Sequence, residues 1–497
     1  MVFSTIIFLF RFLPITLALY YLAPAKLKNT VLFLCSLVFY CWGEVRFFPV
    51  MVALILINYL SGLAIEHFDA KPALRRFFLL VALVGSLGML FYFKYANFVL
   101  RSVNALLGTA FAEIQGIGTL PLGISFYTFQ TLSYSIDVYR RDVKAERNII
   151  DFGAYVVMFP QLIAGPIVKY RDVSDQLHVY KHRYNLKQIE EGMTLFTFGL
   201  AKKVLLADAV GALWTDIIGV ADSPSTTFVG LANASTPLVW LGIIAYSLQL
   251  YFDFSGYSLM GIGMGKMLGF DFPQNFNYPY ISASITEFWR RWHMTLSGWF
   301  REYVYIPLGG SRCSTARCCV NLLITFLVSG LWHGTGLQFA VWGLLHGAYL
   351  AVGRLTAPAR ARLWRASHIP EQSAPARGLK MLVTFVLVWF GWVFFRAPTL
   401  SGALHLFARM PDSFSLAPPA LKNALAMLGF NSGMLIRVGF ACALLCAVDF
   451  AARRTGFSAW LAGRRKWFQA ALCYVLVLAI LFLAPIGASP TPIYFQF

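Results

Sequence analysis

The sequence predicts an all-helical protein that crosses a membrane many times. Of its 497 residues, 58% are hydrophobic and only 13% are charged, and the mean hydropathy is +0.65. A chain with so few charged side chains cannot be solvated as a soluble globule. Long apolar runs recur along it, and polar loops rich in lysine and arginine separate them. These observations are typical of a polytopic membrane protein.

The apolar runs that are candidates for membrane spans lie at residues 3–22, 30–42, 48–65, 77–93, 120–136, 152–168, 193–218, 238–252, 256–270, 320–350, 381–395, 434–450 and 468–485. Several are shorter than the roughly 20 residues that a perpendicular helix needs. Because irregular backbone at membrane depth is tolerated where protein buries it, we expect about eleven true spans together with re-entrant and amphipathic helices. No long hydrophilic insert divides the chain, so residues 1–497 are predicted to form a single membrane domain.

The net charge of +19 indicates membrane topology rather than nucleic-acid binding. Basic residues cluster between the apolar runs, for example at 140–147, 301–317 and 354–380, and loops of this kind face the cytoplasm. The basic loop after the first run places the N-terminus outside. That run has no basic residue before Arg11, so we interpret it as a retained span and not as a signal peptide.

The cysteines predict no disulfide framework. Five of the eight lie inside apolar runs, where a cysteine behaves as a small hydrophobic residue. Cys313, Cys318 and Cys319 share a basic loop but lack the paired C-x-x-C spacing of a zinc site.

Two histidines, His293 and His333, lie in otherwise apolar sequence. Imidazole exchanges a proton near neutral pH, and a polar group in hydrocarbon is costly, so both are candidates for function. Ser284 and Glu287 form a capping box that predicts a helix from about residue 285. On that helix His293 would share an aromatic face with Trp289, four residues before it.

The surroundings of His333 predict a helix that is broken inside the membrane. Apolar runs precede and follow it without a charge, and glycines stand at positions 330, 334 and 336. An imidazole at such a break can take the proton of a hydroxyl that attacks a thioester carbonyl. The alternative is that each histidine is a packing residue, hydrogen-bonded across the bundle.

Other polar residues near these histidines have two interpretations each. Asp253 either accepts hydrogen bonds from nearby Ser255 or Tyr257, or orients a catalytic histidine. Arg290 and Arg291 are either positive-inside residues or ligands for the phosphates of a coenzyme donor. We expect solvated or capping roles for the remaining histidines, which are His67, His178, His182, His346, His368 and His405.

Several aromatic and glycine-rich stretches match the pattern of one family. They read MVFSTIIFLFRFLP, YFKYAN, PLGISFYTFQTLSYSIDVYR, FPQLIAGPIVKY, QLYFDFSGYSLMGIGMGKMLGF, FNYPYISASITEFWRRWHMTLSGWFREYVYIPLGG, SGLWHGTG and GWVFFRA. Each is weak alone, but together they are specific. The chain resembles the membrane-bound O-acyltransferase (MBOAT) family, and within it the bacterial alginate O-acetylation branch.

The resemblance implies a ring of helices around a thin central region, with a cytoplasmic tunnel for acyl-coenzyme A and an outward-facing funnel. It implies that His333, in LWHG, is catalytic with Trp332 in support, and that His293, in WRRWH, is the second catalytic histidine. It further implies transfer of acetyl groups from cytoplasmic acetyl-CoA, with no metal, in the bacterial inner membrane. The acceptor would be an exported polysaccharide, reached through a periplasmic partner of the SGNH-hydrolase-like type.

Two other functions remain open at the level of the sequence. One is D-alanyl transfer from a carrier protein in teichoic acid modification, which related family members perform. The other is a transporter or flippase that uses the histidines as a proton relay. A transporter would need a pathway lined by several ionisable groups, and the apolar runs offer few.

Overall fold

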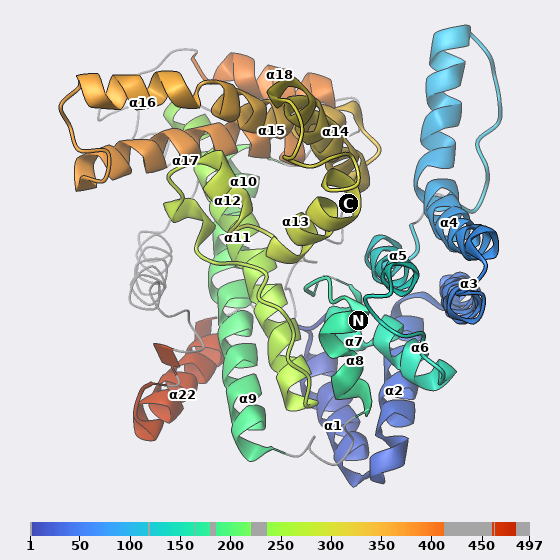
Figure 1. The fold of residues 1–497 in the computed structure, drawn as a ribbon. Coiled ribbons are helices and arrows are strands. Elements are labelled where there is room, and N and C mark those ends of the chain that lie inside the picture. Colours follow the sequence, from blue (N-terminus) through green and yellow to red (C-terminus); the bar gives the residue numbers. More distant parts are fainter. Residues whose placement is uncertain are drawn as a thin grey trace. The chain divides into compact units, whose positions relative to one another are not determined.

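A computed structural model shows a helical chain over the residues that it describes, which are 2–117, 120–163, 165–178, 185–219, 236–411, 460–461 and 463–483 (Figure 1). No strand occurs in these ranges, which confirms the predicted all-helical class. The predicted span at residues 434–450 lies outside the described residues.

The described residues group into two compact units, the first within Met1–Gly199 and Tyr257–Pro273 and the second within Leu200–Gly256 and Gln274–Pro485. The single membrane domain over residues 1–497 stays a prediction. The first unit contains α1 (Leu13–Leu22), α2 (Lys28–Glu44), α3 (Phe48–His67), α4 (Pro72–Leu107), α5 (Ile124–Arg140), α6 (Ile149–Val157), α7 (Phe159–Leu162), α8 (Tyr170–His178) and most of α9 (Leu186–Ala201). The second contains α10 (Asp208–Ile217), α12 (Ile285–Trp289), α13 (Met294–Phe300), α14 (Thr315–His333), α15 (Leu337–Leu355), α16 (Ala357–Ala366), α17 (Ala374–Arg396), α18 (Leu400–Arg409) and α22 (Lys466–Leu483). Helix α11 (Thr236–Met267) contributes its first part to the second unit and its last part to the first.

Five helical stretches among the described residues are long and apolar enough to cross a membrane. They are Ala25–His67, which includes α2 and α3, and the helices α4, α11, α14 and α17. Length and composition therefore support a multi-pass membrane protein. The predicted total of about eleven spans stays a prediction.

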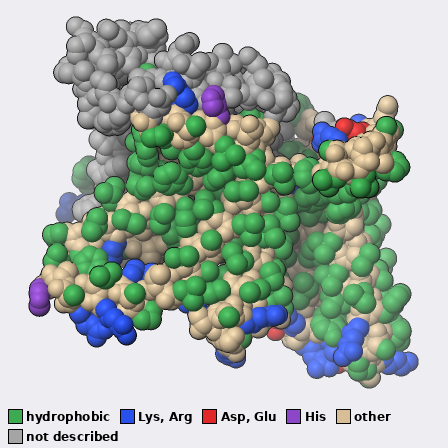
Figure 2. Space-filling model, turned by 90° about the horizontal axis from the view of Figure 1, so that it is seen from above, with side chains coloured by type: hydrophobic (Ala, Val, Ile, Leu, Met, Phe, Trp, Pro, Cys, Tyr) green, Lys and Arg blue, Asp and Glu red, His purple; other side chains and the backbone are tan. Residues whose placement is uncertain are grey.

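One face of α4 carries a stripe of exposed apolar side chains. Leu80, Val84, Leu87 and Phe91 follow one another at helical spacing and are all exposed. Figure 2 shows that hydrophobic side chains cover most of the visible described surface. Soluble monomers rarely expose so much contiguous apolar area, so we expect this surface to face lipid.

Helices α14 and α15 form an antiparallel hairpin whose close approach depends on glycine. A Cβ atom on Gly330 would lie 2.2 Å from the carbonyl oxygen of Phe339, and one on Gly343 would lie 2.2 Å from that of Phe326. Neither position can hold a side chain unless the helices move apart. Small residues at a crossing let the backbones of membrane helices meet, and here they bring the last turn of α14 against α15.

Replacing Gly330 with valine is expected to destabilise the protein by about 1–3 kcal/mol or more, because the new side chain must displace α15. Thermal unfolding of the purified protein in detergent measures the loss. Gly378→Ala on α17 is the control, since no atom lies within 4 Å of an added Cβ there. Equal melting temperatures for the wild type and Gly330→Val would contradict the close packing.

Candidate functional site

His333 is the last residue of α14 and is buried among aromatic rings. Its ring centroid lies 4.8 Å from that of Trp332, 5.0 Å from that of Trp342 and 5.1 Å from that of Phe395. The backbone of the next residue, Gly334, is extended, and α15 follows after a short connection. Helix α14 therefore ends at His333, as predicted, but the chain then reverses into the antiparallel helix α15. That this break lies inside the membrane stays a prediction.

The structure corrects the predicted helix around His293. Helix α12 begins where the capping box predicts, with Ser284 Oγ accepting a hydrogen bond from the Glu287 amide at 3.1 Å. It ends at Trp289, however, and His293 adopts a left-handed backbone with φ of 41° before α13 begins. The prediction that His293 continues the helical face of Trp289 is wrong.

Asn275 holds His293 in this turn. Its main-chain oxygen accepts a hydrogen bond from the Met294 amide at 2.8 Å. Its side-chain Oδ1 accepts from Nδ1 of His293 and from the Thr295 hydroxyl, both at 2.9 Å. Contacts with Asn275 thus hold a turn where the helical pattern alone predicts a continuous helix, and local sequence does not reveal such a contact.

The same contact sets the protonation of His293. An amide oxygen only accepts, so Nδ1 of the ring carries the proton and Nε2 holds the lone pair. His293 lies outside the five candidate spans, and burial lowers the pKa of its ring to about 3. The neutral ring is therefore a hydrogen-bond acceptor at Nε2 and a weak base.

A series of ring contacts joins the two histidines. His333 contacts Trp342, whose centroid lies 6.4 Å from that of Trp392, and Trp392 lies 4.8 Å from Trp292. Trp292 directly precedes His293 in the chain. Packed aromatic rings exclude water, and polar interactions are stronger in such surroundings than in solvent.

A third histidine, His346, lies in the same aromatic cluster, and the solvated or capping role predicted for it is wrong. It is fully buried on α15, and its Nδ1 accepts a hydrogen bond from Nε1 of Trp289 at 3.3 Å. A Cβ on Gly391 would lie 2.5 Å from Nε2 of His346, so α17 packs directly on the ring. Glycines before and after His346 in α15, at 343 and 347, were the available sequence signal for burial. His178, in contrast, is half-exposed and binds the Ser174 carbonyl, as predicted for a capping residue.

A cavity of about 580 Å³ lies among α12, α13, α14 and α15. Three arginines line it, namely Arg290, Arg301 and Arg354, together with several hydroxyl side chains. One of these hydroxyls belongs to Ser329, which lies one helical turn before His333 and so shares its face of α14. The lining of the cavity therefore carries three arginines and comes within one helical turn of His333.

The structure distinguishes Arg290 from Arg291, which the sequence alone does not. Arg291 forms an ion pair with Glu287, with Nε to Oε1 at 2.9 Å, and its Nη1 donates to the Asn277 carbonyl at 3.1 Å. It therefore stabilises the turn that follows α12. Arg290 is exposed and lines the cavity, so Arg290 is the one of the pair placed to meet a ligand.

Asp253 belongs to a buried ion network. Nζ of Lys203 lies 2.9 Å from Oδ1 of Asp253 and 2.5 Å from Oδ1 of Asp208, and all three side chains are almost fully buried. Local sequence patterns do not connect Lys203 with Asp253, because the two residues are distant along the chain. This network favours a structural role for Asp253.

The described residues thus form a helical chain in which a buried histidine ends α14 one turn beyond an arginine-lined cavity. Residues 143–372 match the model of the MBOAT, membrane-bound O-acyltransferase family. The chain is 44% identical over 455 residues to a protein of Azotobacter vinelandii named probable alginate O-acetylase AlgI, covering 91% of this chain and 84% of that protein.

Two further relatives carry different names. A peptidoglycan O-acetyltransferase of Helicobacter pylori is 33% identical over 537 residues, covering 100% of this chain and 98% of that protein. A teichoic acid D-alanyltransferase of Streptococcus thermophilus is 29% identical over 242 residues, covering 46% of this chain and 56% of that protein. The chain belongs to the membrane-bound O-acyltransferase family, and it is an O-acyltransferase and a multi-pass membrane protein.

Replacing Lys203 with methionine is expected to destabilise the protein by about 3–5 kcal/mol, because two buried carboxylates lose their common cation. Unfolding in detergent, followed by tryptophan fluorescence, measures the effect. The matched control is Lys380→Met, which removes a more exposed pair with Glu371 and should cost less than about 1 kcal/mol. Equal losses in the two variants would show that the buried network is not important for folding.

Proposed function

We propose that this protein is an inner-membrane O-acetyltransferase that takes acetyl groups from cytoplasmic acetyl-CoA. The observation that carries the proposal is the position of His333 at the break between α14 and α15, one turn beyond Ser329 in the cavity wall. The names of the relatives at 44% and 33% identity support acetyl as the group transferred.

In the proposed reaction His333 acts as general base. Its ring takes the proton of an acceptor hydroxyl as the oxygen attacks the carbonyl carbon of the acetyl thioester. The carbon–sulfur bond then breaks, the acetyl group leaves as an ester of the acceptor, and the proton returns from the imidazole to the coenzyme A sulfur. Trp332 and Trp342 hold the ring from two sides, which limits its orientation.

His293 would position the donor. Because Asn275 engages Nδ1, the ring offers a lone pair at Nε2. A lone pair accepts hydrogen bonds from amide N–H groups, and the pantetheine arm of coenzyme A carries two amides. The neutral ring would not polarise the thioester carbonyl, because that carbonyl oxygen needs a hydrogen-bond donor and Nε2 is an acceptor. This assignment gives the two histidines different tasks.

The arginine-lined cavity is the proposed site for the phosphates of the donor. Arginine binds phosphate oxygens through several directed N–H groups. Arg290, Arg301 and Arg354 line one cavity, and Arg301 and Arg354 lie in segments that the positive-inside rule assigns to the cytoplasm. A donor held there presents its phosphates to the basic side and its thioester arm toward α14.

The acceptor is proposed to be an exported polysaccharide, reached through a periplasmic SGNH-hydrolase-like partner.

D-alanyl transfer is less favoured, since the D-alanyltransferase relative matches less than half of this chain, whereas the O-acetylase and O-acetyltransferase relatives match most or all of it. A transporter or flippase is not favoured either, because it would need a pathway lined by several ionisable groups, and the apolar runs offer few.

His333→Ala is expected to lower acetyl transfer by a factor of about 100 or more, the usual contribution of a general base. The assay follows label from radioactive acetyl-CoA to a candidate partner or polymer with purified protein in detergent. Equilibrium binding of acetyl-CoA should be retained. His405→Ala, an exposed position on α18, is the control with unchanged turnover. Full activity of His333→Ala would refute the assigned role.

Arg290→Ala is expected to raise the KM for acetyl-CoA about 10-fold to 100-fold with little change in kcat, since a hydrogen bond to a charged group contributes about 1.5–3 kcal/mol. Arg365→Ala, on the exposed surface of α16, removes the same charge elsewhere and serves as control. A second donor, acetyl-CoA without the 3′-phosphate, identifies which phosphate Arg290 binds. If it is the 3′-phosphate, Arg290→Ala and the wild type should have the same KM for this donor. Unchanged KM in Arg290→Ala would exclude the cavity as the phosphate site.

A further inference from the structure

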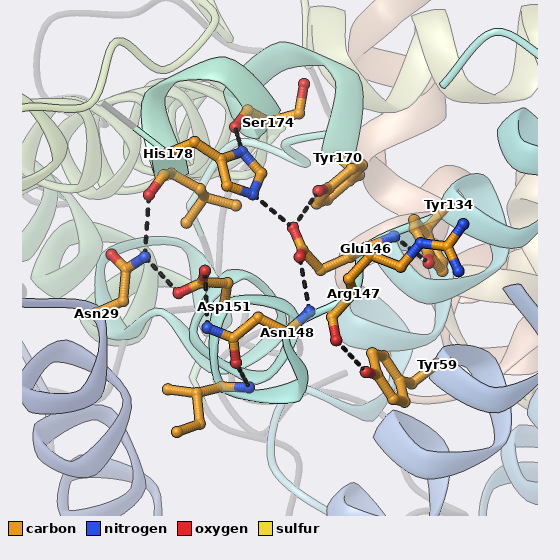
Figure 3. Close-up of polar contacts among 12 residues, drawn as sticks. Asn29, Tyr59, Tyr134, Glu146, Arg147, Asn148, Asp151, Tyr170, Ser174 and His178 are labelled. Atoms are coloured by element: carbon orange, nitrogen blue, oxygen red, sulfur yellow. Dashed lines mark hydrogen bonds and ion pairs between the residues drawn. The ribbon is translucent and has the colours of Figure 1, made fainter. Parts of the chain in front are cut away.

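Three side chains that commonly bind metal ions meet in the first unit, and none of them belongs to the site of His293, His333 and His346. Glu146 precedes α6, Asp151 lies in the first turn of α6, and His178 ends α8. One ligand atom from each lies within 4.8 Å of the other two (Figure 3). Glu146 and Asp151 are buried, whereas His178 is half-exposed. A cavity of about 750 Å³ is lined by all three.

The orientation of His178 points to a cation beside it. Its Nδ1 lies 2.8 Å from the Ser174 carbonyl oxygen, which can only accept, so Nδ1 carries the proton. The other nitrogen, Nε2, lies 3.0 Å from Oε2 of Glu146. In the neutral ring Nε2 holds a lone pair, which a carboxylate oxygen repels. The contact is favourable only if Nε2 carries a proton or if a cation lies between the nitrogen and the oxygen. Either a proton or a metal ion must satisfy this contact.

The hydrogen bonds around the two carboxylates match those of an outer ligand shell. Tyr170 donates its hydroxyl to Oε2 of Glu146 at 2.5 Å, and the Asn148 amide donates to Oε1 at 2.8 Å. Oδ1 and Oδ2 of Asp151 accept from the side chains of Asn29 and Asn148 at 2.5 and 3.0 Å. Metal ligands are usually oriented by such bonds, and a metal-binding histidine usually gives its second N–H to a carbonyl or carboxylate, as His178 does.

The cluster combines negative charge with a nitrogen ligand, which suits a divalent metal ion. Two buried carboxylates and one imidazole bring their ligand atoms within 4.8 Å of one another. Arg147, the next residue after Glu146, directs Nη2 to Glu66 at 2.7 Å. Lys144 and Arg171 also line the cavity, as do the acidic Asp142 and Asp175, so the wider lining carries both signs of charge.

We infer that Glu146, Asp151 and His178 bind one divalent transition-metal ion, which connects the segment before α6 to the end of α8. Two ligand atoms that are each about 2.1 Å from a metal ion and at right angles lie about 3.0 Å apart, which is the separation observed between His178 Nε2 and Glu146 Oε2. One imidazole with two carboxylates suits ions such as Mn²⁺ and Zn²⁺ better than Ca²⁺. The ion would be a structural element, and the inference does not depend on the proposed acetyl transfer.

The test uses untagged full-length protein in detergent, treated with a chelator and then dialysed. Mn²⁺ is titrated and followed by electron paramagnetic resonance, and Zn²⁺ is measured separately by calorimetry. We expect one saturable site per chain, and a melting temperature that rises with the concentration of the metal, because an ion that binds only the folded state stabilises it.

His178→Ala is the decisive variant, because the side chain is half-exposed and its loss should leave the fold intact. Affinity for Mn²⁺ should fall at least about 10-fold, while the melting temperature in chelator stays close to that of the wild type. Glu146→Gln should weaken binding as well. Asp175→Asn, which lines the same cavity outside the ligand set, should bind as the wild type does. Absence of a saturable site in the wild type, or equal affinity in His178→Ala, would overturn the inference and leave an imidazolium–carboxylate pair.

Discussion

A buried polar group needs a partner within the protein, because neither a packed apolar core nor hydrocarbon supplies one. In the described part of the chain, buried amides and ion pairs supply several of these partners. Asn275 satisfies His293 and Thr295 together, and Lys203 is shared by two aspartates. The contacts of Asn275 with His293 and of Lys203 with Asp253 join separate segments of the chain, so these polar groups also specify the tertiary fold.

The same constraint explains why glycine is placed where the backbone changes course. Gly330 and Gly343 have no side chain, so the backbones of α14 and α15 come into direct contact. The hairpin can then turn immediately after His333, within a shell of aromatic rings. A larger residue at either glycine would separate the helices and open that shell. The burial of His333 therefore depends on the close packing of α14 against α15.

Sequence alone predicted the class of fold and the helix break at His333, because both follow from local composition. The capping box at Ser284 gave the correct start of α12. The turn at His293 and the burial of His346 were not predictable, since Asn275 and Gly391 act from other segments. For the same reason the sequence could not choose between Arg290 and Arg291, which differ only in whether Glu287 and Asn277 engage them. Long-range contacts decided each of these cases.

The distribution of charge in the second unit gives the proposed transfer a direction. The phosphates of a coenzyme donor carry several negative charges, which are costly to move into an aromatic interior. Arg290, Arg301 and Arg354 would hold them at the cavity, while the uncharged pantetheine arm can follow the face of α14 past Ser329. The acetyl group is small and neutral, so it is the part of the donor that can reach His333 and continue to an acceptor on the other side. Under this proposal, separation of the arginine-lined cavity from the aromatic centre would let the acyl group cross while the coenzyme stays on the side from which it came.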